Sequence, residues 1–400
     1  MKVPFGTLTV SESAKKMIAD VLMTERLTMG YLVDQFEQQF ARVFGAKEAV
    51  AVSSGTDALV LALAALYENK WVRRGDEIIV PALSFVATGN AVLHAGFCPV
   101  FVDVELDSMN IDPNMIVSKI TPKTRAIVVV HLMGKPAKMK QIMEIAAKHK
   151  LQVIEDAAEA HGGSIKNMGN CGTMGQMGCF STYAAHIVST VEGGVVVTND
   201  ENLAEVLRSL RSHGRACVCR NCVLQRGETN CHKRFDLETG EDTRFSFMRV
   251  GYSSKMNELE AAVGLGNLEK FDEIFNKRRR NLLRGIAGVK TLNPTLWTIS
   301  EDEGELIGPH ALPVVLGKDV KKTRAQLSQF LTDHEIDSRT MFECMPTQCP
   351  GFAFLGHELG DFPNAEYISS RGVHVGVHQD LNDDQIDHVI STLGEFVRLP

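Results

Sequence analysis

Seven short apolar runs, rich in valine and isoleucine, recur along the first half of this 400-residue chain. They are EAVAVSS (48–54), DEIIVPA (76–82), CPVFVDV (98–104), RAIVVVHL (125–132), LQVIEDA (151–157), GCFSTY (178–183) and GGVVVTN (193–199). Runs that are apolar on both faces are typical of strands buried in a parallel sheet, with helices covering both sides. Helical stretches such as 56–67 and 137–150 lie between them. The pattern predicts an α/β fold built on a seven-stranded, mostly parallel sheet.

The pattern changes after about residue 200. One long helix is expected over 256–283, and from about residue 285 the strands and helices indicate a smaller α+β unit. A chain of this length, with 44% hydrophobic residues, is long enough to form two cores. We therefore predict a large domain over 1–275 and a small C-terminal domain over 276–400.

Charge and hydropathy exclude several classes of partner. The net charge is −7, and acidic and basic residues are mixed throughout, so we expect no nucleic-acid partner. The N-terminus lacks a secretory signal, and no apolar run reaches the roughly 18–20 residues needed to span a bilayer. We expect a cytoplasmic protein with no membrane partner. In a reducing compartment, its nine cysteines are more often free, metal-bound or catalytic than paired as disulfides.

Polar sequence follows the predicted strands, and in an open α/β sheet ligands bind at the carboxyl ends of the strands. At SSGTDAL (53–59) a strand gives way to a helix. The free N–H groups of such a helix start favour an anion, although Ser and Thr there also fit simple caps. Asp156 ends an apolar strand, where a buried carboxylate is costly unless it is paired. It fits either a cap or a partner for the protonated ring nitrogen of a pyridoxal cofactor.

The order of these segments resembles the DegT/StrS family of nucleotide-sugar aminotransferases. The similar segments are SSGTDAL, PALSFVATGNAV, PVFVDVELDSMNID, VVHLMGKPAKM, VIEDAAEAHGG, FSTYAAH, EGGVVVTND, RSHGR and FPNAEYISSRGVHVGVHQDLNDDQID. They run from about residue 20 to the C-terminus. The resemblance implies the fold of aspartate aminotransferase, a type I pyridoxal-phosphate enzyme. It also implies a homodimer with its active sites at the dimer interface.

The resemblance assigns cofactor roles to five residues that match the family pattern. Gly55 and Thr56 would hold the cofactor phosphate, with help from Ser181. Phe85 would stack on the pyridine ring, and Asp156 would pair with the ring nitrogen.

Two further positions depart from the usual family residue. Glu159 stands where a Gln usually lies near the ring hydroxyl. Ser253 stands where an Asn usually reaches the phosphate bound by the partner subunit. His310 and His378 match positions near the sugar, although each fits a structural role equally well. These four assignments depend wholly on the resemblance.

The cofactor-binding lysine of the family is missing. The family carries it near the end of a segment FSFYPxK, six residues before an acidic residue and two glycines. Here the segment is FSTYAAHIVSTVEGG, the position is His186, and no lysine occurs between Lys166 and Lys233. Histidine cannot anchor the cofactor covalently, but its neutral imidazole can act as a general base near neutral pH. A protein with a base but no amine at this position suits a cofactor held in its aminated form, pyridoxamine phosphate. The alternative is an inactive relative in which the histidine is accidental.

Two groups of sugar 3-dehydratases share this exchange of lysine for histidine. One acts on a GDP-linked 4-keto-6-deoxymannose without a metal, and the other acts on CDP-linked sugars and carries an iron–sulfur cluster. In both, the resemblance implies that the histidine removes a proton from the cofactor's methylene carbon while the C3 hydroxyl leaves. The protein orients the reactants, and the cofactor ring accepts electrons.

A cysteine-rich loop at 215–235 bears on the choice between the two groups. It holds Cys217, Cys219, Cys222 and Cys231, in the spacing C-x-C-x2-C-x8-C. Four thiolates suit either zinc or an iron–sulfur cluster, and unligated thiols are a further alternative. Spacing alone does not choose between them. The loop resembles that of the iron–sulfur dehydratases, but their upstream cysteine is absent from EDAAEA (155–160). Cys222 would replace it, so the cluster is either 4Fe-4S or 2Fe-2S.

Three hypotheses follow. The leading one is a homodimeric, pyridoxamine-phosphate-dependent 3-dehydratase of a 4-keto-6-deoxy nucleotide sugar, with an iron–sulfur cluster fed by a reductase or ferredoxin. The second keeps a histidine-based dehydratase or an aminotransferase-like enzyme, takes the amine from an amino acid, and makes the cysteines a structural zinc site. The third is a non-catalytic regulator that binds the cofactor or a sugar.

Overall fold

The computed structural model describes residues 1–220, 231, 234–236 and 238–399. Its central sheet has seven strands in the order β1-β9-β8-β5-β4-β2-β3. Neighbours from β8 to β3 are parallel, and β9 is antiparallel to both β1 and β8. The predicted seven-stranded, mostly parallel sheet is therefore confirmed. Its strands are β1 (Glu48–Val52), β2 (Glu77–Pro81), β3 (Cys98–Val102), β4 (Thr124–Val130), β5 (Gln152–Asp156), β8 (Met177–Ser181) and β9 (Gly194–Thr198).

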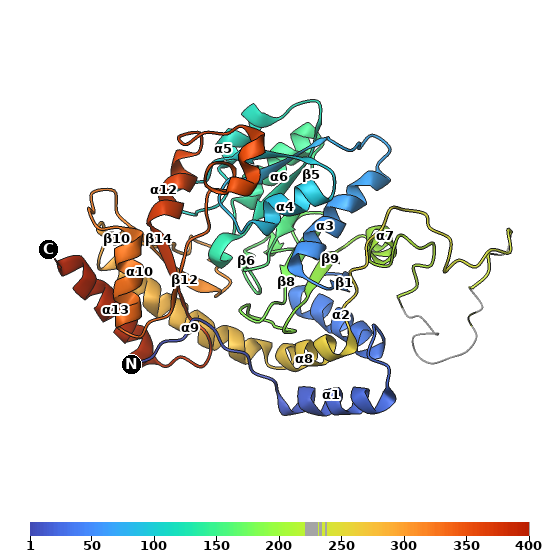
Figure 1. Cartoon of the computed structure of the whole chain (residues 1–400), viewed down its shortest axis with the longest axis horizontal. Coiled ribbons are helices and arrows are strands. Elements are labelled where there is room, and N and C mark those ends of the chain that lie inside the picture. Colours follow the sequence, from blue (N-terminus) through green and yellow to red (C-terminus); the bar gives the residue numbers. More distant parts are fainter. Residues whose placement is uncertain (221–230, 232–233, 237, 400) are drawn as a thin grey trace.

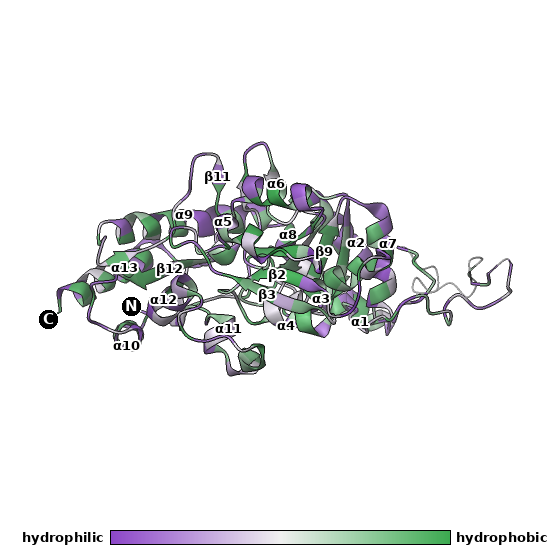
Figure 2. Ribbon diagram, turned by 90° about the horizontal axis from the view of Figure 1, so that it is seen from above, coloured by the Kyte–Doolittle hydropathy of each residue, from purple (hydrophilic) through white to green (hydrophobic). Residues whose placement is uncertain are grey.

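Helices cover both faces of this sheet (Figure 1). Along β4, Val128 and Val130 face the core on the side of α3 and α4, whereas Ile127 and Val129 face the core on the side of α6. This alternation explains why the strands are apolar on both faces. In Figure 2 the strands are mostly hydrophobic, while α6 and α7 carry hydrophilic stretches. The helices of this part are α1 (Glu12–Thr24), α2 (Tyr31–Phe44), α3 (Gly55–Ala65), α4 (Ala87–His94), α5 (Pro113–Ile116), α6 (Met139–His149), α7 (Glu201–Arg211) and α8 (Glu258–Leu268), with 3-10 turns η1 (Leu66–Glu68), η2 (Val117–Lys119) and η3 (Leu132–Gly134).

The C-terminal part forms a smaller α+β unit around an antiparallel sheet in the order β10-β12-β14-β13. Its strands are β10 (Leu296–Trp297), β12 (Ala311–Leu316), β13 (Ser338–Thr340) and β14 (Gly372–Gly376). Its helices are α9 (Phe271–Lys290), α10 (Arg324–Asp333), α11 (Met345–Gln348), η4 (Pro350–Leu355), α12 (Pro363–Arg371) and α13 (Asp383–Arg398). A third small sheet, β11 (Glu305–Leu306), β6 (Ser164–Ile165) and β7 (Gly169–Asn170), joins the two units, because β11 pairs with β6.

The single helix predicted over 256–283 is wrong. The chain forms two helices, because α8 ends at Leu268 and α9 begins at Phe271. Between them Lys270 has φ −107° and ψ 11°, outside the α-helical region. An apolar pattern that continues across such a break cannot show it.

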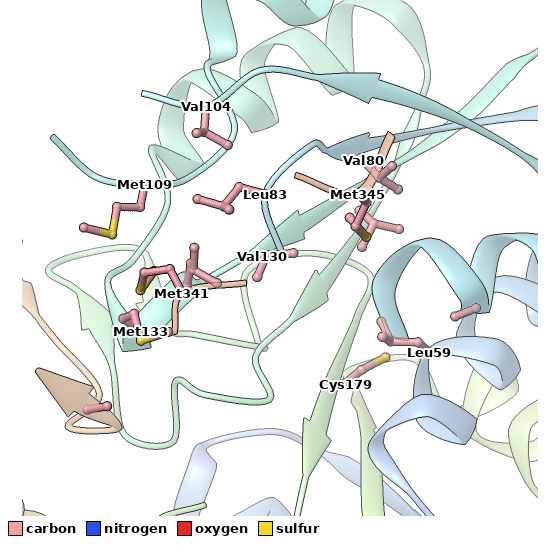
Figure 3. Close-up of a cluster of buried hydrophobic side chains, with 14 of the residues drawn as sticks. Leu59, Val80, Leu83, Val104, Met109, Val130, Met133, Cys179, Met341 and Met345 are labelled. Atoms are coloured by element: carbon pink, nitrogen blue, oxygen red, sulfur yellow. The ribbon is translucent and has the colours of Figure 1, made fainter. Parts of the chain in front are cut away.

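The two units share one core. Figure 3 shows Met341 and Met345 of the C-terminal part among apolar side chains of the large unit, including Leu83 and Val130. The start of the chain also lies on the C-terminal unit, where Val3 pairs with residues 335–337. The division at residues 275 and 276 stays a prediction. No helix among the described residues is long and apolar enough to cross a membrane.

Candidate active site

A cavity of 580 Å³ lies at the carboxyl ends of β4, β5 and β8, and both units line it. Seven of the eight residues predicted for catalysis or cofactor binding lie on its wall, and Ser253 does not. The seven are Gly55, Thr56, Phe85, Asp156, Glu159, Ser181 and His186. The structure thus brings together segments that are up to about 130 residues apart in the sequence. Their roles stay predictions.

The start of α3 forms one end of the cavity. The Ser54 hydroxyl accepts from the Asp57 N–H at 3.0 Å, which caps the helix and leaves the N–H groups of Gly55 and Thr56 without intrahelical acceptors. A β-carbon at Gly55 would lie 2.6 Å from the Ser181 Cβ, so only glycine lets the two segments approach. Positively polarised N–H groups beside a serine hydroxyl can hold a phosphate.

Asp156 is the last residue of β5, and its carboxylate is buried. The Thr88 hydroxyl donates to its Oδ2 at 2.8 Å, and the Ala158 N–H approaches its Oδ1 at 3.3 Å. Ser84 in turn hydrogen-bonds Thr88 at 2.8 Å. Burial raises the pKa of Asp156 above its usual range. A cation placed in the cavity would reverse that shift, because it favours the charged carboxylate.

His186 lies in the loop that follows β8. The loop is closed by a hydrogen bond of 2.6 Å between the Thr182 and Thr190 hydroxyls, and it turns back through Gly193 at φ +147°. The Nδ1 atom of His186 is buried and has no hydrogen-bond partner. Burial, and then the charge of Arg278, lowers the pKa of His186 to about 3. The imidazole is therefore neutral at pH 7, which is the form that accepts a proton.

Two more histidines and an acid surround His186. The ring of His310 lies 5.1 Å from that of His186, and the ring of His161 lies 6.2 Å from it. The His310 Nε2 is 3.3 Å from the Glu159 Oε1, and the Met133 N–H donates to the Glu159 Oε2 at 2.7 Å. Burial is the main reason that the pKa of Glu159 rises to about 8. Glu159 therefore carries a proton at neutral pH and can donate a hydrogen bond, as the amide of a Gln would.

The sequence did not single out several residues of this site. Thr88, His161 and Arg278 contact or surround the predicted residues, and the C-terminal unit adds Arg339 and His374 to the cavity wall. Phe5 also lines the cavity, although it lies more than 300 residues from Arg339. No local pattern links such distant positions. The sequence does show that Thr88 follows Ser84 by four residues, a spacing at which their hydroxyls can hydrogen-bond.

Ser253 and the cysteine-rich loop lie away from the cavity. Ser253 is exposed and forms an antiparallel bridge with Ser212. After α7 the chain leaves the body of the molecule on the side away from the C-terminal unit (Figure 1). Cys217, Cys219 and Cys231 lie in this segment, and Cys222 lies outside the described residues. Within the described part of the chain, no three His, Cys, Asp or Glu side chains are grouped as they are around a metal ion.

Comparison with known proteins covers nearly the whole chain. A model of the DegT/DnrJ/EryC1/StrS aminotransferase family matches residues 9–394. A dTDP-4-dehydro-2,6-dideoxy-D-glucose 3-dehydratase from Saccharopolyspora spinosa is 34% identical over 410 residues, which is 98% of this chain and 86% of that protein. A GDP-4-keto-6-deoxy-D-mannose 3-dehydratase from Escherichia coli O55:H7 is 33% identical over 397 residues, which is 98% of this chain and 99% of that protein.

A solved structure shows the same likeness in three dimensions. The E. coli GDP-4-keto-6-deoxy-D-mannose-3-dehydratase with bound hydrated PLP matches this chain with a TM-score of 0.83 and 30% identity. The match covers 98% of this chain and 100% of that one. Both units, and the cavity that they line, therefore take part in the likeness.

Proposed function

The chain belongs to the DegT/DnrJ/EryC1/StrS aminotransferase family and has the PLP-dependent aminotransferase fold, and from that premise we propose that it is a pyridoxamine-phosphate-dependent sugar 3-dehydratase. It would remove the C3 hydroxyl of a 4-keto-6-deoxy nucleotide sugar. One observation carries this choice over an aminotransferase. His186 lines the cavity, and no lysine is among the described residues that line it. In the sequence, His186 stands where the resemblance puts the family lysine.

The cavity fits the cofactor at both of its polar ends. The N–H groups at the start of α3 and the Ser181 hydroxyl suit the phosphate, and the lack of a side chain at Gly55 lets these two segments lie close together. Asp156 suits a protonated ring nitrogen, because none of the ion pairs found among the described residues involves its carboxylate. Phe85 is 57% exposed on the loop after β2, so its ring is available to cover a planar ligand.

His186 provides the base in this proposal. The cofactor, when bound, supplies an amino group and an electron-accepting ring. The neutral imidazole of His186 takes a proton at one of its ring nitrogens, and its orphaned Nδ1 shows that a lone pair or N–H there is not used by the protein. Asp156 would hold a proton at the ring nitrogen of the bound cofactor, and protonated Glu159 would donate a hydrogen bond beside it.

Two substitutions at one position test the role of His186. His186→Asn should retain pyridoxamine phosphate but lose C3 dehydration, measured by mass spectrometry of 4-keto-6-deoxy sugars linked to dTDP, GDP or CDP. His186→Lys should bind pyridoxal phosphate covalently, seen as a mass increase fixed by borohydride. His94→Lys, at an exposed position of α4, is the matched control and should show no adduct.

The outcomes separate the three hypotheses. Turnover that persists in His186→Asn would remove His186 from the base role. Wild-type protein that binds the cofactor but turns over no 4-keto sugar nucleotide would favour the regulator. Transfer of an amino group to the sugar would favour the aminotransferase-like enzyme.

A finer part of the proposal is an iron–sulfur cluster, 4Fe-4S or 2Fe-2S, on Cys217, Cys219, Cys222 and Cys231, with electrons from a reductase or ferredoxin. Its support is the density and spacing of these cysteines in the sequence. Among the described residues, Cys217, Cys219 and Cys231 do not form a group of three metal-binding side chains. Anaerobically purified protein should contain iron and sulfide and lose its visible absorbance with dithionite. Cys217→Ser should lose the iron, whereas the control Cys349→Ser should keep it. Colourless protein that contains only zinc would overturn this part.

The proposal also includes a homodimer. Ser253 is exposed and does not line the cavity of its own chain, which suits a residue that serves a partner subunit. The preceding residues Phe247, Met248 and Val250 are between 55% and 79% exposed. Large apolar side chains gathered in one exposed segment are typical of an interface.

A further inference from the structure

One cationic side chain on the cavity wall has no part in the proposed reaction. Arg339 is the only Lys or Arg among the described residues that line the cavity. The acids on the same wall are Asp156, Glu159 and Glu192. A lone guanidinium in a ligand cavity is a permanent positive charge, because arginine stays protonated.

Arg339 is held by strand pairing and by an aromatic ring. It lies in β13 directly opposite His374 of β14, so the two side chains share one face of the sheet. Its Cζ lies 4.4 Å from the centre of the Phe5 ring, which is within range of a cation–π interaction. The Phe5 ring also packs edge-on against His374 at 5.3 Å.

Residues 3–5, the N-terminal strap, bring Phe5 to this position. Val3 forms two backbone hydrogen bonds of 2.9 Å with Glu335 and Asp337. The Phe5 N–H approaches the Asp337 carboxylate at 3.3 Å. The strap lies so close to β14 that a β-carbon at Gly376 would be 2.0 Å from the Phe5 carbonyl oxygen. Figure 1 shows the chain starting beside the C-terminal unit before it runs to α1.

The charge of Arg339 is exposed and is not neutralised within the described chain. The side chain is exposed, and none of its described contacts is an ion pair or a hydrogen bond to a carboxylate. Its neighbour His374 adds no negative charge. Burial, and then Arg339, lowers the pKa of His374 to about 3, so its ring is neutral at pH 7.

We propose that Arg339 binds an anionic group of the substrate, a carboxylate or a phosphate, and that the N-terminal strap positions its guanidinium through Phe5. This inference rests on the cavity being the substrate site of the proposed function. The guanidinium presents a planar fork of N–H donors that matches either anion in two parallel hydrogen bonds. A nucleotide sugar would bring a diphosphate, whereas an amino acid that supplies the amine, as in the second hypothesis, would bring a carboxylate. Arg339 is therefore a specificity-determining residue, and Phe5 is a positioning residue.

Calorimetry on the cofactor-loaded protein tests this with two kinds of probe. Glutarate carries carboxylates without phosphate, and dTDP and GDP carry phosphate without carboxylate. Arg339→Gln should raise the Kd of one kind of probe roughly ten- to a hundredfold, and Arg339→Lys should recover part of the loss. The probe that responds identifies the source of the anion. Arg398→Gln, at an exposed position of α13, is the matched control.

A second substitution, with a smaller expected effect on the Kd, tests the N-terminal strap. Phe5→Leu keeps an apolar side chain but removes the ring, so it should raise the same Kd about two- to fivefold. Phe354→Leu, which changes an exposed ring elsewhere, should leave it unchanged. Equal Kd values in wild type and Arg339→Gln for every probe, or no binding of any probe to wild type, would overturn the inference. Because binding is measured without turnover, loss of the proposed dehydration alone would refute only the function.

Discussion

Glu155 and Asp156 are consecutive buried carboxylates at the end of β5, and they lie on opposite faces of the sheet. Glu155 accepts from the His131 Nε2 at 2.9 Å and from three backbone N–H groups of residues 172–175 at 2.5 to 2.8 Å. Asp156 has one hydroxyl donor at 2.8 Å and one N–H at 3.3 Å, and it faces the cavity. The two residues differ in how many donors the protein itself supplies.

This difference separates a structural acid from a functional one. A buried carboxylate needs several donors, because it has lost its water. Glu155 has them, and it ties β4, β5 and the 172–175 loop together. Asp156 keeps unused acceptor capacity beside an open cavity, so a ligand bound there can supply a further partner. Burial alone does not identify a site residue, whereas burial with too few donors does.

Removing the charge of Asp156 should have the largest effect on function. Asp156→Asn keeps the side-chain shape but no longer stabilises a cationic ring nitrogen, so the Kd for pyridoxamine phosphate should rise roughly a hundredfold or more. Turnover should fall at least as much. Calorimetric titration with pyridoxamine phosphate measures the first effect. An unchanged Kd would mean that the ring nitrogen lies elsewhere.

Removing the charge of Glu155 is the matched control for Asp156→Asn. This change should lower the stability of the fold and not the affinity for the cofactor. Glu155→Gln places an NH2 group among donors that need an acceptor, so the free energy of unfolding should fall by about 3 kcal/mol. Urea unfolding followed by circular dichroism measures this. The Kd for pyridoxamine phosphate should change by less than about threefold where the variant is folded. A loss of affinity as large as that of Asp156→Asn would show that the two faces are coupled.

The contrast also explains what the sequence could predict. The seven strands and the end of β5 were readable because the apolar alternation is local, and the positions of Gly55, Asp156 and His186 followed from segments in a familiar order. Which of two adjacent acids faces the cavity was not readable from alternation alone, because both faces of the sheet are covered. It was supplied by the resemblance.

Contacts between distant segments were beyond the sequence. Phe5 and Arg339 meet only because the N-terminal strap pairs with residues 335–337. The break between α8 and α9 depends on the backbone of Lys270 and leaves no mark in the apolar pattern. The cysteine spacing was equally clear in the sequence, but Cys222 lies outside the described residues, and the described part of the chain shows no group of three metal-binding side chains. The role of these cysteines therefore stays a prediction.

Glu159 is the intermediate case between these two acids, Glu155 and Asp156, and its effect on stability should depend on pH. Its usual pKa of 4.5 rises to about 8 in the folded chain, so between these values the folded state holds a proton that the unfolded state has released. Its contribution to stability is therefore present below about pH 4.5 and is lost as pH rises towards 8, by up to about 1.4 kcal/mol per pH unit. Glu159→Gln keeps the hydrogen bonds but cannot titrate. The difference in unfolding free energy between cofactor-free wild type and this variant should therefore shift steadily against wild type from pH 5 to 8. A difference that is flat across that range would mean that Glu159 is ionised in the folded chain. It would then present an anionic carboxylate to the cavity, and it would not act as a neutral hydrogen-bond donor in place of Gln.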